Sequence, residues 1–221
     1  MTWLRCESCS HVFTDGYFSP EVASVVFSKA HENQKPASDM ERQRPISARV
    51  VERVARHVSE GAWLDVGFGN GSLLFTAAEW GFEPVGIDLR QSSVDAMARF
   101  GVEVHCVDIA SLNGDGRFSV VSMADVLEHM PFPKVGLTAA RRLLKDGGVL
   151  FISMPNFGCP LWQFLDSQRT NPYWSEIEHF HNFSRARLYA LLKEMGFTPL
   201  GYDVSQRYRV CMEIVARYES R

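Results

Sequence analysis

A group of glycines and acids within residues 63–88 has the types and spacing needed to bind a nucleoside-like ligand. Glycines recur at alternate positions, where the missing Cβ lets the backbone turn sharply and approach a ligand closely: Gly67, Gly69 and Gly71. Asp65 lies two residues before the first of them, and its carboxylate could pair with an ammonium group. Asp88 ends the next apolar run, where an acid is placed to accept hydrogen bonds from ribose hydroxyls.

The elements around these residues are predicted to form a βαβ unit. Residues 62–66 are a short apolar run, which predicts a central parallel strand buried on both faces. Residues 72–80 carry apolar side chains at helical spacing and stop at Gly81, which predicts a helix. Residues 84–87 predict a second strand. Strand, glycine turn, helix, strand and acid is the order of a nucleotide-binding unit.

The glycine spacing separates two kinds of nucleotide site. Dinucleotide-binding proteins space their glycines G-x-G-x-x-G, and the pyrophosphate needs the helix N-terminus to be free. Here the spacing is G-x-G-x-G with Asp65 before it, which favours a cofactor that has an ammonium group and no phosphates. A nicotinamide-dependent oxidoreductase and an accidental glycine turn remain alternatives.

The remaining chain continues the alternation of helices and strands. Further elements are predicted as strands at residues 102–107, 118–124 and 149–154, and as helices at residues 47–58, 91–100 and 131–144. Residues 200–204 and 210–216 predict a hairpin, in which one strand must run antiparallel. Residues 28–45 are polar and predict a linker. The expected fold is α/β, with a doubly wound, mostly parallel sheet and a C-terminal antiparallel hairpin.

Histidines follow the fourth and fifth predicted strands, at the edge where open α/β sheets bind ligands. His129 follows the fourth strand, and His179 and His181 follow the fifth. Histidine accepts a proton near neutral pH, so each of them is a candidate catalytic base. Together with Glu128 and Glu178 the same histidines could instead bind a divalent metal, or fix the loop geometry through hydrogen bonds.

Residues 1–35 differ in character from residues 36–221 and are predicted to be an N-terminal extension to the main domain. Cys6 and Cys9 form a Cys-x-x-Cys pair, whose thiolates could hold one side of a tetrahedral zinc ion. A closed zinc site needs four ligands, and the sequence has no second such pair, although His11 is a candidate third ligand. The pair is half a zinc site, truncated or shared between the subunits of a homodimer, or a remnant that binds no metal. A redox pair is a further alternative.

Composition narrows the expected partners. A net charge of −3 provides no broad basic surface for nucleic acid or for an anionic membrane. No apolar run approaches the roughly 20 residues of a transmembrane helix, and the N-terminus lacks the pattern of a secretory signal. Five cysteines, an odd number, do not suggest a disulfide framework, so a cytoplasmic location is expected. The length of 221 residues suits one α/β domain with small extensions.

From about Ser47 to the C-terminus the sequence resembles the class I S-adenosylmethionine-dependent methyltransferases, most closely the subgroup that contains the ubiquinone-biosynthesis O-methyltransferases. The resemblance rests on residues 64–71 (LDVGFGNG), 124–131 (ADVLEHMP), 143–148 (LLKDGG) and 178–185 (EHFHNFSR). It implies a seven-stranded sheet whose last strand is antiparallel, and S-adenosylmethionine as the cofactor. Several relatives begin with a zinc ribbon ending in a Cys-x-x-Cys pair, and the first half of such a ribbon is missing here.

The resemblance also implies roles for individual residues. Asp65 and the glycines would hold the methionine part of the cofactor, Asp88 the ribose, and Asp108 with Ile109 the adenine. The chemistry of that last pair fits, because a carboxylate accepts from the exocyclic amine while an aliphatic side chain covers the ring. Asp108 is alternatively a helix or turn cap. Two further positions are expected at the cofactor, Leu89 and Ala124.

The expected function is methyl transfer from S-adenosylmethionine to a small-molecule acceptor, at an oxygen, with assistance from a histidine base. Two alternatives stay open. The half zinc ribbon favours a sugar or glycan methyltransferase of a cell-surface or antibiotic cluster, and an S-adenosylmethionine-binding module without turnover is the other. Residues 156–180 are rich in aromatic side chains, which are expected either to cover the acceptor or to pack in the core of a short helix.

Overall fold

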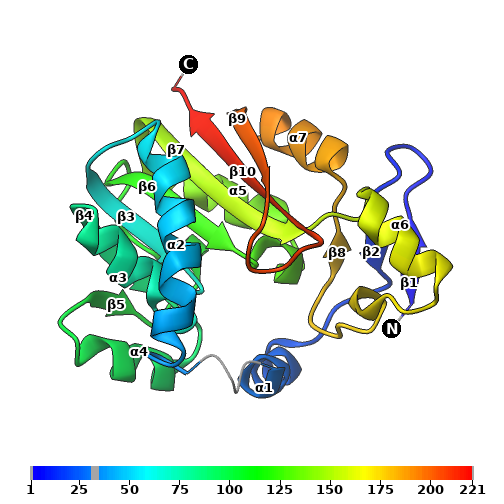
Figure 1. Ribbon diagram of the computed structural model, residues 1–221, viewed down its shortest axis with the longest axis horizontal. Helices are drawn as coiled ribbons and strands as arrows, with labels where there is room; N and C mark the ends of the chain where they lie inside the picture. The colour runs from blue at the N-terminus through cyan, green and yellow to red at the C-terminus, as the bar shows by residue number, and fades with distance from the viewer. Residues whose placement is uncertain (1, 31–34, 221) are drawn as a thin grey trace.

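The computed structural model describes residues 2–30 and 35–220. A seven-stranded sheet with helices on both faces forms its main body, and a three-stranded sheet lies at one end (Figure 1). The strands of the large sheet are β3 (Gly61–Val66), β4 (Phe82–Ile87), β5 (Glu103–His105), β6 (Phe118–Ala124), β7 (Leu144–Pro155), β9 (Phe197–Val204) and β10 (Cys211–Tyr218). The helices around it are α2 (Met40–Ala55), α3 (Ser72–Glu79), α4 (Gln91–Ala98), α5 (Pro133–Leu143) and α7 (Arg185–Glu194).

The strand order of the large sheet is β5-β4-β3-β6-β7-β10-β9. β10 pairs antiparallel with both β7 and β9, whereas the pairs among β3 to β7 are parallel. The predicted mostly parallel, seven-stranded sheet with a C-terminal antiparallel hairpin is confirmed. Because the chain runs from β3 toward one edge and returns to β6 on the other side of β3, the carboxyl ends of these two strands flank the switch point where such sheets bind ligands.

The central strand β3 is buried on both faces, as its continuous apolar run requires. Trp63 is fully buried and packs with side chains of α2 and α3. Leu64 and Val66 point to the opposite face, where they join the cluster that contains α5 and α7. Alternate side chains of β3 are therefore buried in the helix layers on the two faces of the sheet. This burial fixes the register of β3 and the position of the glycine turn after it.

Two predictions about element boundaries are wrong. The helix predicted at residues 47–58 begins at Met40, inside the predicted linker, and contains Pro45. Ser47, whose residue type predicts the N-cap of that helix, lies inside α2, and its Oγ is 2.9 Å from the Oγ of Ser72 in the buried contact between α2 and α3. The residues KDGG at positions 145–148 predict a turn, but they lie within β7, where the pairing with β6 shifts register. Residues 31–34 of the predicted linker lie outside the described residues.

The N-terminal extension is tied to the main domain by a small sheet. β1 (Trp3–Arg5) and β2 (Val12–Thr14) form an antiparallel hairpin, and β2 pairs with β8 (His181–Asn182). The helix α1 (Pro20–Ala30) follows the hairpin. Among the described residues, none of the helices combines the length and the apolar character that crossing a membrane requires.

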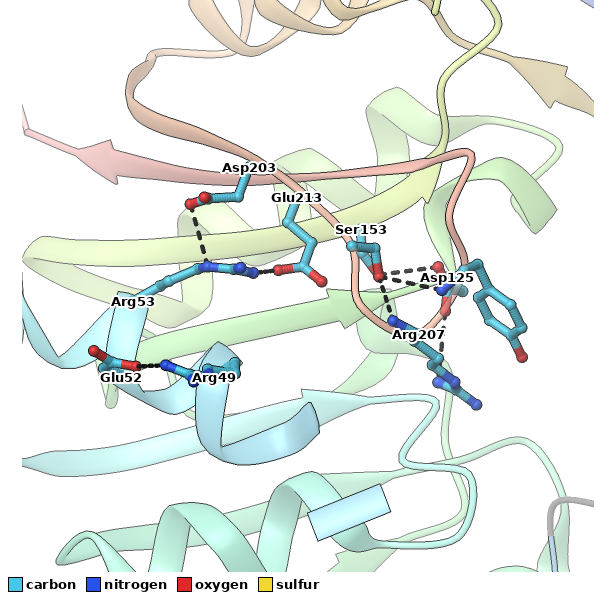
Figure 2. Close-up of polar contacts among 10 residues, drawn as sticks. Arg49, Glu52, Arg53, Asp125, Ser153, Asp203, Arg207 and Glu213 are labelled. Carbon is cyan, nitrogen blue, oxygen red and sulfur yellow. Dashed lines mark hydrogen bonds and ion pairs between the residues drawn. The ribbon is translucent and has the colours of Figure 1, made fainter. Parts of the chain in front are cut away.

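An ion-pair cluster joins α2 to the C-terminal hairpin (Figure 2). Arg53 of α2 pairs with Glu213 of β10, and its Nε lies 3.2 Å from Oδ2 of Asp203 on β9. The side chain of Glu213 is only 4% exposed, so its charge depends on this partner. α2 therefore gains an electrostatic attachment to β9 and β10 besides its apolar packing on β3.

Candidate active site

A cavity of about 840 Å³ opens at the carboxyl ends of β3, β4 and β6. It is lined by most of the residues predicted to bind a cofactor: Asp65, Gly67, Gly69, Asp88, Leu89, Asp108, Ile109 and Ala124. Two of the predicted bases, His129 and His179, line it as well. The structure thus gathers into one cavity residues that come from five separate loops, as the switch-point geometry requires.

The glycine turn supplies bare backbone to the cavity floor. Gly67 and Gly69 adopt φ angles of 67° and 57°, which disfavour other residues. A Cβ on Gly67 would lie 3.0 Å from Cγ2 of Val126, a contact so tight that Val126 would have to shift. Gly71 does not line the cavity; its φ is 83°, and a Cβ there would overlap Met97. Gly71 therefore serves the start of α3 and its packing on α4.

Asp65 is 3% exposed, at the base of the cavity. Its Oδ1 accepts a hydrogen bond of 2.6 Å from Ser122 Oγ, which in turn accepts one from the indole of Trp63 at 2.8 Å. Burial raises the pKa of Asp65 to about 7, and the Ser122 hydrogen bond and the positive charge of Arg207 only partly oppose this shift. A carboxyl in this state gains a favourable partner when a cation enters the cavity.

Asp88 already has a partner. The backbone N–H and Nε of Arg90 donate to its Oδ1 at 2.9 Å each, and Nη2 donates to its Oδ2 at 2.7 Å. The carboxylate is 6% exposed and the guanidinium side chain 19% exposed. Any hydroxyl that binds Asp88 therefore competes with the Arg90 side chain for the acceptor sites of this carboxylate.

Asp108 is used as a cap, the alternative that the sequence left open for it. Its Oδ1 accepts a 2.8 Å hydrogen bond from the backbone N–H of Ala110 at the start of the 3-10 helix η1 (Ile109–Ser111). Asp108 also lines the cavity, next to the buried Ile109. Capping and ligand contact are compatible, because a carboxylate has several acceptor sites.

The three candidate histidines separate into two environments. His129 lies in the 3-10 helix η2 (Leu127–His129), and its Nδ1 lies 3.0 Å from the backbone oxygen of Glu178. The rings of His129 and His179 meet edge to face at 4.7 Å. His181 is not brought to the cavity, since β8 places its Nδ1 3.0 Å from Nε2 of His11 and its Nε2 3.3 Å from the oxygen of Pro131.

The carboxyl group of Glu128 lies close to the two cavity histidines, His129 and His179. Ligand atoms of Glu128, His129 and His179 all lie within 4.8 Å of one another, the arrangement that a divalent cation or a proton-transfer group would use. Glu128 is 1% exposed, and burial, followed by the negative charge of Asp125, raises its pKa well above the usual range. Its position directly before His129 was the sequence signal for this role.

Asp125 and Arg207 are site residues that the sequence analysis missed. Asp125 follows β6 with a strained φ of 56°, and its Oδ1 accepts a 2.9 Å hydrogen bond from Ser153 Oγ. Nη1 of Arg207, from the loop between β9 and β10, lies 3.5 Å from Oδ2 of Asp125 (Figure 2). Asp125 had a signal, as an acid directly after a predicted strand. Arg207 had none, because its loop reaches the cavity only through the folding of the C-terminal hairpin.

The aromatic segment expected over the acceptor divides between wall and core. Tyr173 lines the cavity. Trp162, on α6 (Pro160–Ser167), is buried and stacks on Tyr173 with ring centroids 5.3 Å apart. Trp174 packs against Trp162 and against Trp3 of β1. The N-terminal extension thus packs against the aromatic segment of residues 156–180 through Trp3.

Cys6 and Cys9 lie in the turn between β1 and β2. The turn is closed by a 2.8 Å hydrogen bond from the N–H of Cys6 to the oxygen of His11 and by one of 2.9 Å from the N–H of Ser10 to the oxygen of Cys6. His11 is directed to His181 instead. Within residues 2–30 and 35–220, Glu128, His129 and His179 form the one group of three or more metal-ligating side chains, so the cysteine pair has no third ligand there.

Comparison with known proteins identifies the family. A family model described as a methyltransferase domain matches residues 39–201, most of the chain. The chain belongs to the class I S-adenosylmethionine-dependent methyltransferases. It is 34% identical over 107 residues to a ubiquinone biosynthesis O-methyltransferase of Idiomarina loihiensis, a match that covers 45% of this chain and 44% of the relative. A protein of the same description from Xanthomonas oryzae pv. oryzae is 36% identical over 101 residues, which is 42% of each chain.

These matches span less than half the length of the curated relatives. Among solved structures, a 1,6-didemethyltoxoflavin-N1-methyltransferase of Burkholderia thailandensis, bound to 1,6-didemethyltoxoflavin and S-adenosylhomocysteine, has a TM-score of 0.70. The similarity covers 98% of this chain and 99% of that one, at 17% sequence identity. This likeness shows the fold of the methyltransferase.

S-adenosylmethionine is the cofactor of this methyltransferase family, and the cavity residues fit it chemically. The cofactor presents hydrogen-bond donors at its ammonium group, its ribose hydroxyls and its adenine amine. Acceptor carboxylates stand at the ends of three neighbouring strands, on Asp65, Asp88 and Asp108. The glycine turn presents backbone without side chains to the cavity next to the first of them.

Proposed function

We propose that this methyltransferase transfers a methyl group from S-adenosylmethionine to an oxygen of a small-molecule acceptor. The supporting observation is a single cavity that contains both the predicted cofactor residues and a cluster of proton-accepting side chains around His129 and His179. The curated relatives, described as ubiquinone biosynthesis O-methyltransferases, favour oxygen as the methylated atom.

The cofactor residues have separate roles in this proposal. Asp65 binds the ammonium group, because its buried carboxyl is stabilised as an anion by a cation. Asp88 accepts hydrogen bonds from the ribose after the Arg90 side chain withdraws. Asp108 and Ile109 hold the adenine, one by hydrogen bonding and the other by covering the ring.

His129 is the first candidate for the proton acceptor. A backbone carbonyl can only accept, so the contact with the oxygen of Glu178 places the ring hydrogen of neutral His129 on Nδ1. Nε2 is then the nitrogen that can take a proton from an acceptor hydroxyl. His179, 4.7 Å away ring to ring, is the second candidate. The bound cofactor supplies an activated methyl group on a sulfonium, and the cavity contributes by holding the acceptor oxygen about 3 Å from that carbon.

The shape of the cavity supports a small acceptor. Aromatic side chains from distant parts of the chain line it, including Tyr17 and Phe18 of the N-terminal extension, Phe132 and Tyr173. Tyr17 and Phe132 meet edge to face at 5.0 Å. Such walls bury an organic molecule of modest size and leave its orientation to a few polar groups.

The proposal is tested by incubating the purified protein with S-adenosylmethionine carrying a heavy methyl group and with a metabolite extract of the source cell. Mass spectrometry should find a product that carries the label, and Asp65→Asn should remove it. Binding of S-adenosylhomocysteine without any labelled product would favour the module without turnover. Absence of both binding and product would refute the proposal.

A sugar or glycan acceptor is the second candidate, and the cysteine pair in the extension is the observation that favours it. The measurement is the zinc content of the purified protein, with Cys6→Ser as the matched variant and Cys106→Ser as the control. Zinc at about half an equivalent per chain, lost in Cys6→Ser alone, would indicate a site shared by two chains. A protein that is fully active without zinc would remove the support that the cysteine pair gives to a sugar or glycan acceptor.

A further inference from the structure

We propose that the acceptor carries a basic nitrogen, whose ammonium group is held by Glu128, Glu176 and Glu178. This inference rests on the proposed function of the same cavity. Five carboxyl groups line the cavity besides those assigned to the cofactor: Asp125, Glu128, Glu176, Glu178 and Glu213. Two of them have cationic partners, since Arg207 pairs with Asp125 and Arg53 with Glu213. The other three pair with no arginine or lysine among the described residues.

Glu128 points most directly to a ligand. Neither of its carboxyl oxygens has a hydrogen-bond partner among the described residues, although the side chain is 1% exposed and lines the cavity. A buried carboxyl without partners is unfavourable, and a bound hydrogen-bond donor would remove that cost. An ammonium group supplies three donors and a positive charge at once.

Glu176 and Glu178 form the second part of the site. Both carboxyl groups line the cavity, and burial, followed by the negative charge of Glu178, raises the pKa of Glu176. A bound cation favours the ionised form of Glu176, so its binding should release protons to solvent.

The pair is connected to the reacting end of the cavity. The backbone oxygen of Glu178 is the partner of His129 Nδ1, and His129 lies beside Glu128. Phe18 and Phe180, whose rings are 5.9 Å apart, line the same cavity. Aromatic rings next to carboxylates are a common environment for organic ammonium groups, because the ring faces add a cation–π attraction.

The test uses three phenols that differ only in the charge of the substituent: tyramine, 4-ethylphenol and 4-hydroxyphenylacetate. Each is titrated calorimetrically into the protein loaded with S-adenosylhomocysteine, in the presence of EDTA and in two buffers of different ionisation enthalpy. Tyramine should bind at least about tenfold more tightly than 4-ethylphenol and release protons, and 4-hydroxyphenylacetate should bind most weakly. Glu128→Gln and Glu178→Gln should each reduce the preference, whereas Glu83→Gln, an exposed acid outside the cavity, should retain it.

Equal affinity for tyramine and 4-ethylphenol would overturn the inference. So would a preference that survives in both cavity variants, or one that appears only when EDTA is replaced by a divalent metal, since that would make Glu128 a metal ligand. The titration with S-adenosylhomocysteine separates this failure from that of the proposed function. A protein that binds the cofactor product but shows no charge preference refutes only the ammonium site.

Discussion

Replacing Arg90 is expected to tighten cofactor binding, although the residue lines the cavity that we propose for the cofactor. Its guanidinium donates two hydrogen bonds, of 2.9 and 2.7 Å, to the carboxylate that we assign to the ribose. Because both side chains are mostly buried, ribose hydroxyls compete with this guanidinium for the oxygens of Asp88. Arg90→Met keeps the apolar stem and removes the competing donors.

The magnitude follows from what is broken. Water and the ribose compensate much of the loss when the pair separates, so its net contribution is about 1 kcal/mol, or about fivefold in Kd. Asp88→Asn has the opposite sign, because it weakens hydrogen bonds to a charged acceptor worth about 1.5–3 kcal/mol, or about 10- to 150-fold. In the double variant, Arg90→Met should bring little gain over Asp88→Asn alone.

The assay is calorimetric titration with S-adenosylhomocysteine. Arg99→Met is the matched control, since Arg99 is an exposed arginine directly after α4, the helix that Arg90 directly precedes. The reasoning would be refuted if Arg90→Met weakened binding as Asp88→Asn does, because Arg90 would then be a ligand of the cofactor.

Four further predictions concern other parts of the site and its supports. Since the pKa of Asp65 is about 7, its carboxyl is about nine-tenths ionised at pH 8 and about one-tenth ionised at pH 6. S-adenosylhomocysteine should therefore bind about tenfold more weakly at pH 6 than at pH 8. In Asp65→Asn the affinity should not change with pH, and an affinity that does change would contradict the assignment of Asp65. Because of the same raised pKa, the folded protein binds one more proton at Asp65 than the unfolded protein does between about pH 4 and about pH 7. The contribution of Asp65 to the free energy of unfolding should therefore fall as the pH rises through that window, which urea unfolding can measure. Gly71→Ala should lower the free energy of unfolding by about 1–3 kcal/mol through strain and overlap, measured by urea titration. The loss should exceed that of Gly81→Ala, because Gly81 has a similar φ of 89° but open space around a Cβ; equal losses would argue against the overlap. Glu213→Ala should cost about 3 kcal/mol in the same assay by leaving the charge of Arg53 without its buried partner, and a loss below about 1 kcal/mol would show that Asp203 suffices.

The sequence predicted the central elements well where burial on both faces leaves a continuous apolar run. The strand predicted at residues 118–124 matches β6 residue for residue. The sequence-based prediction was wrong for the start of α2, because the polar residues and Pro45 there are not typical of a helix. This part of α2 belongs to a helix that is stabilised by packing on α3 and by the ion pairs of Arg53. Tertiary contact, rather than local propensity, decides that boundary.

The candidate site shows the same division. Acids and glycines at strand ends could be predicted, because parallel strands deliver their carboxyl ends to one edge of the sheet. His181 could not be separated from His179 by sequence, since the pairing of β8 with β2 decides which of them faces the cavity. Arg207 and the Arg90–Asp88 pair depend on side-chain contacts that no local pattern reveals.

A crystal structure of the protein with S-adenosylhomocysteine would test the central claim most directly. We expect the ribose hydroxyls on Asp88 with Arg90 turned away, the ammonium group on Asp65, and the sulfur facing His129 and His179. A ligand bound outside this cavity, or a ribose held elsewhere while Arg90 keeps its contacts with Asp88, would contradict the account.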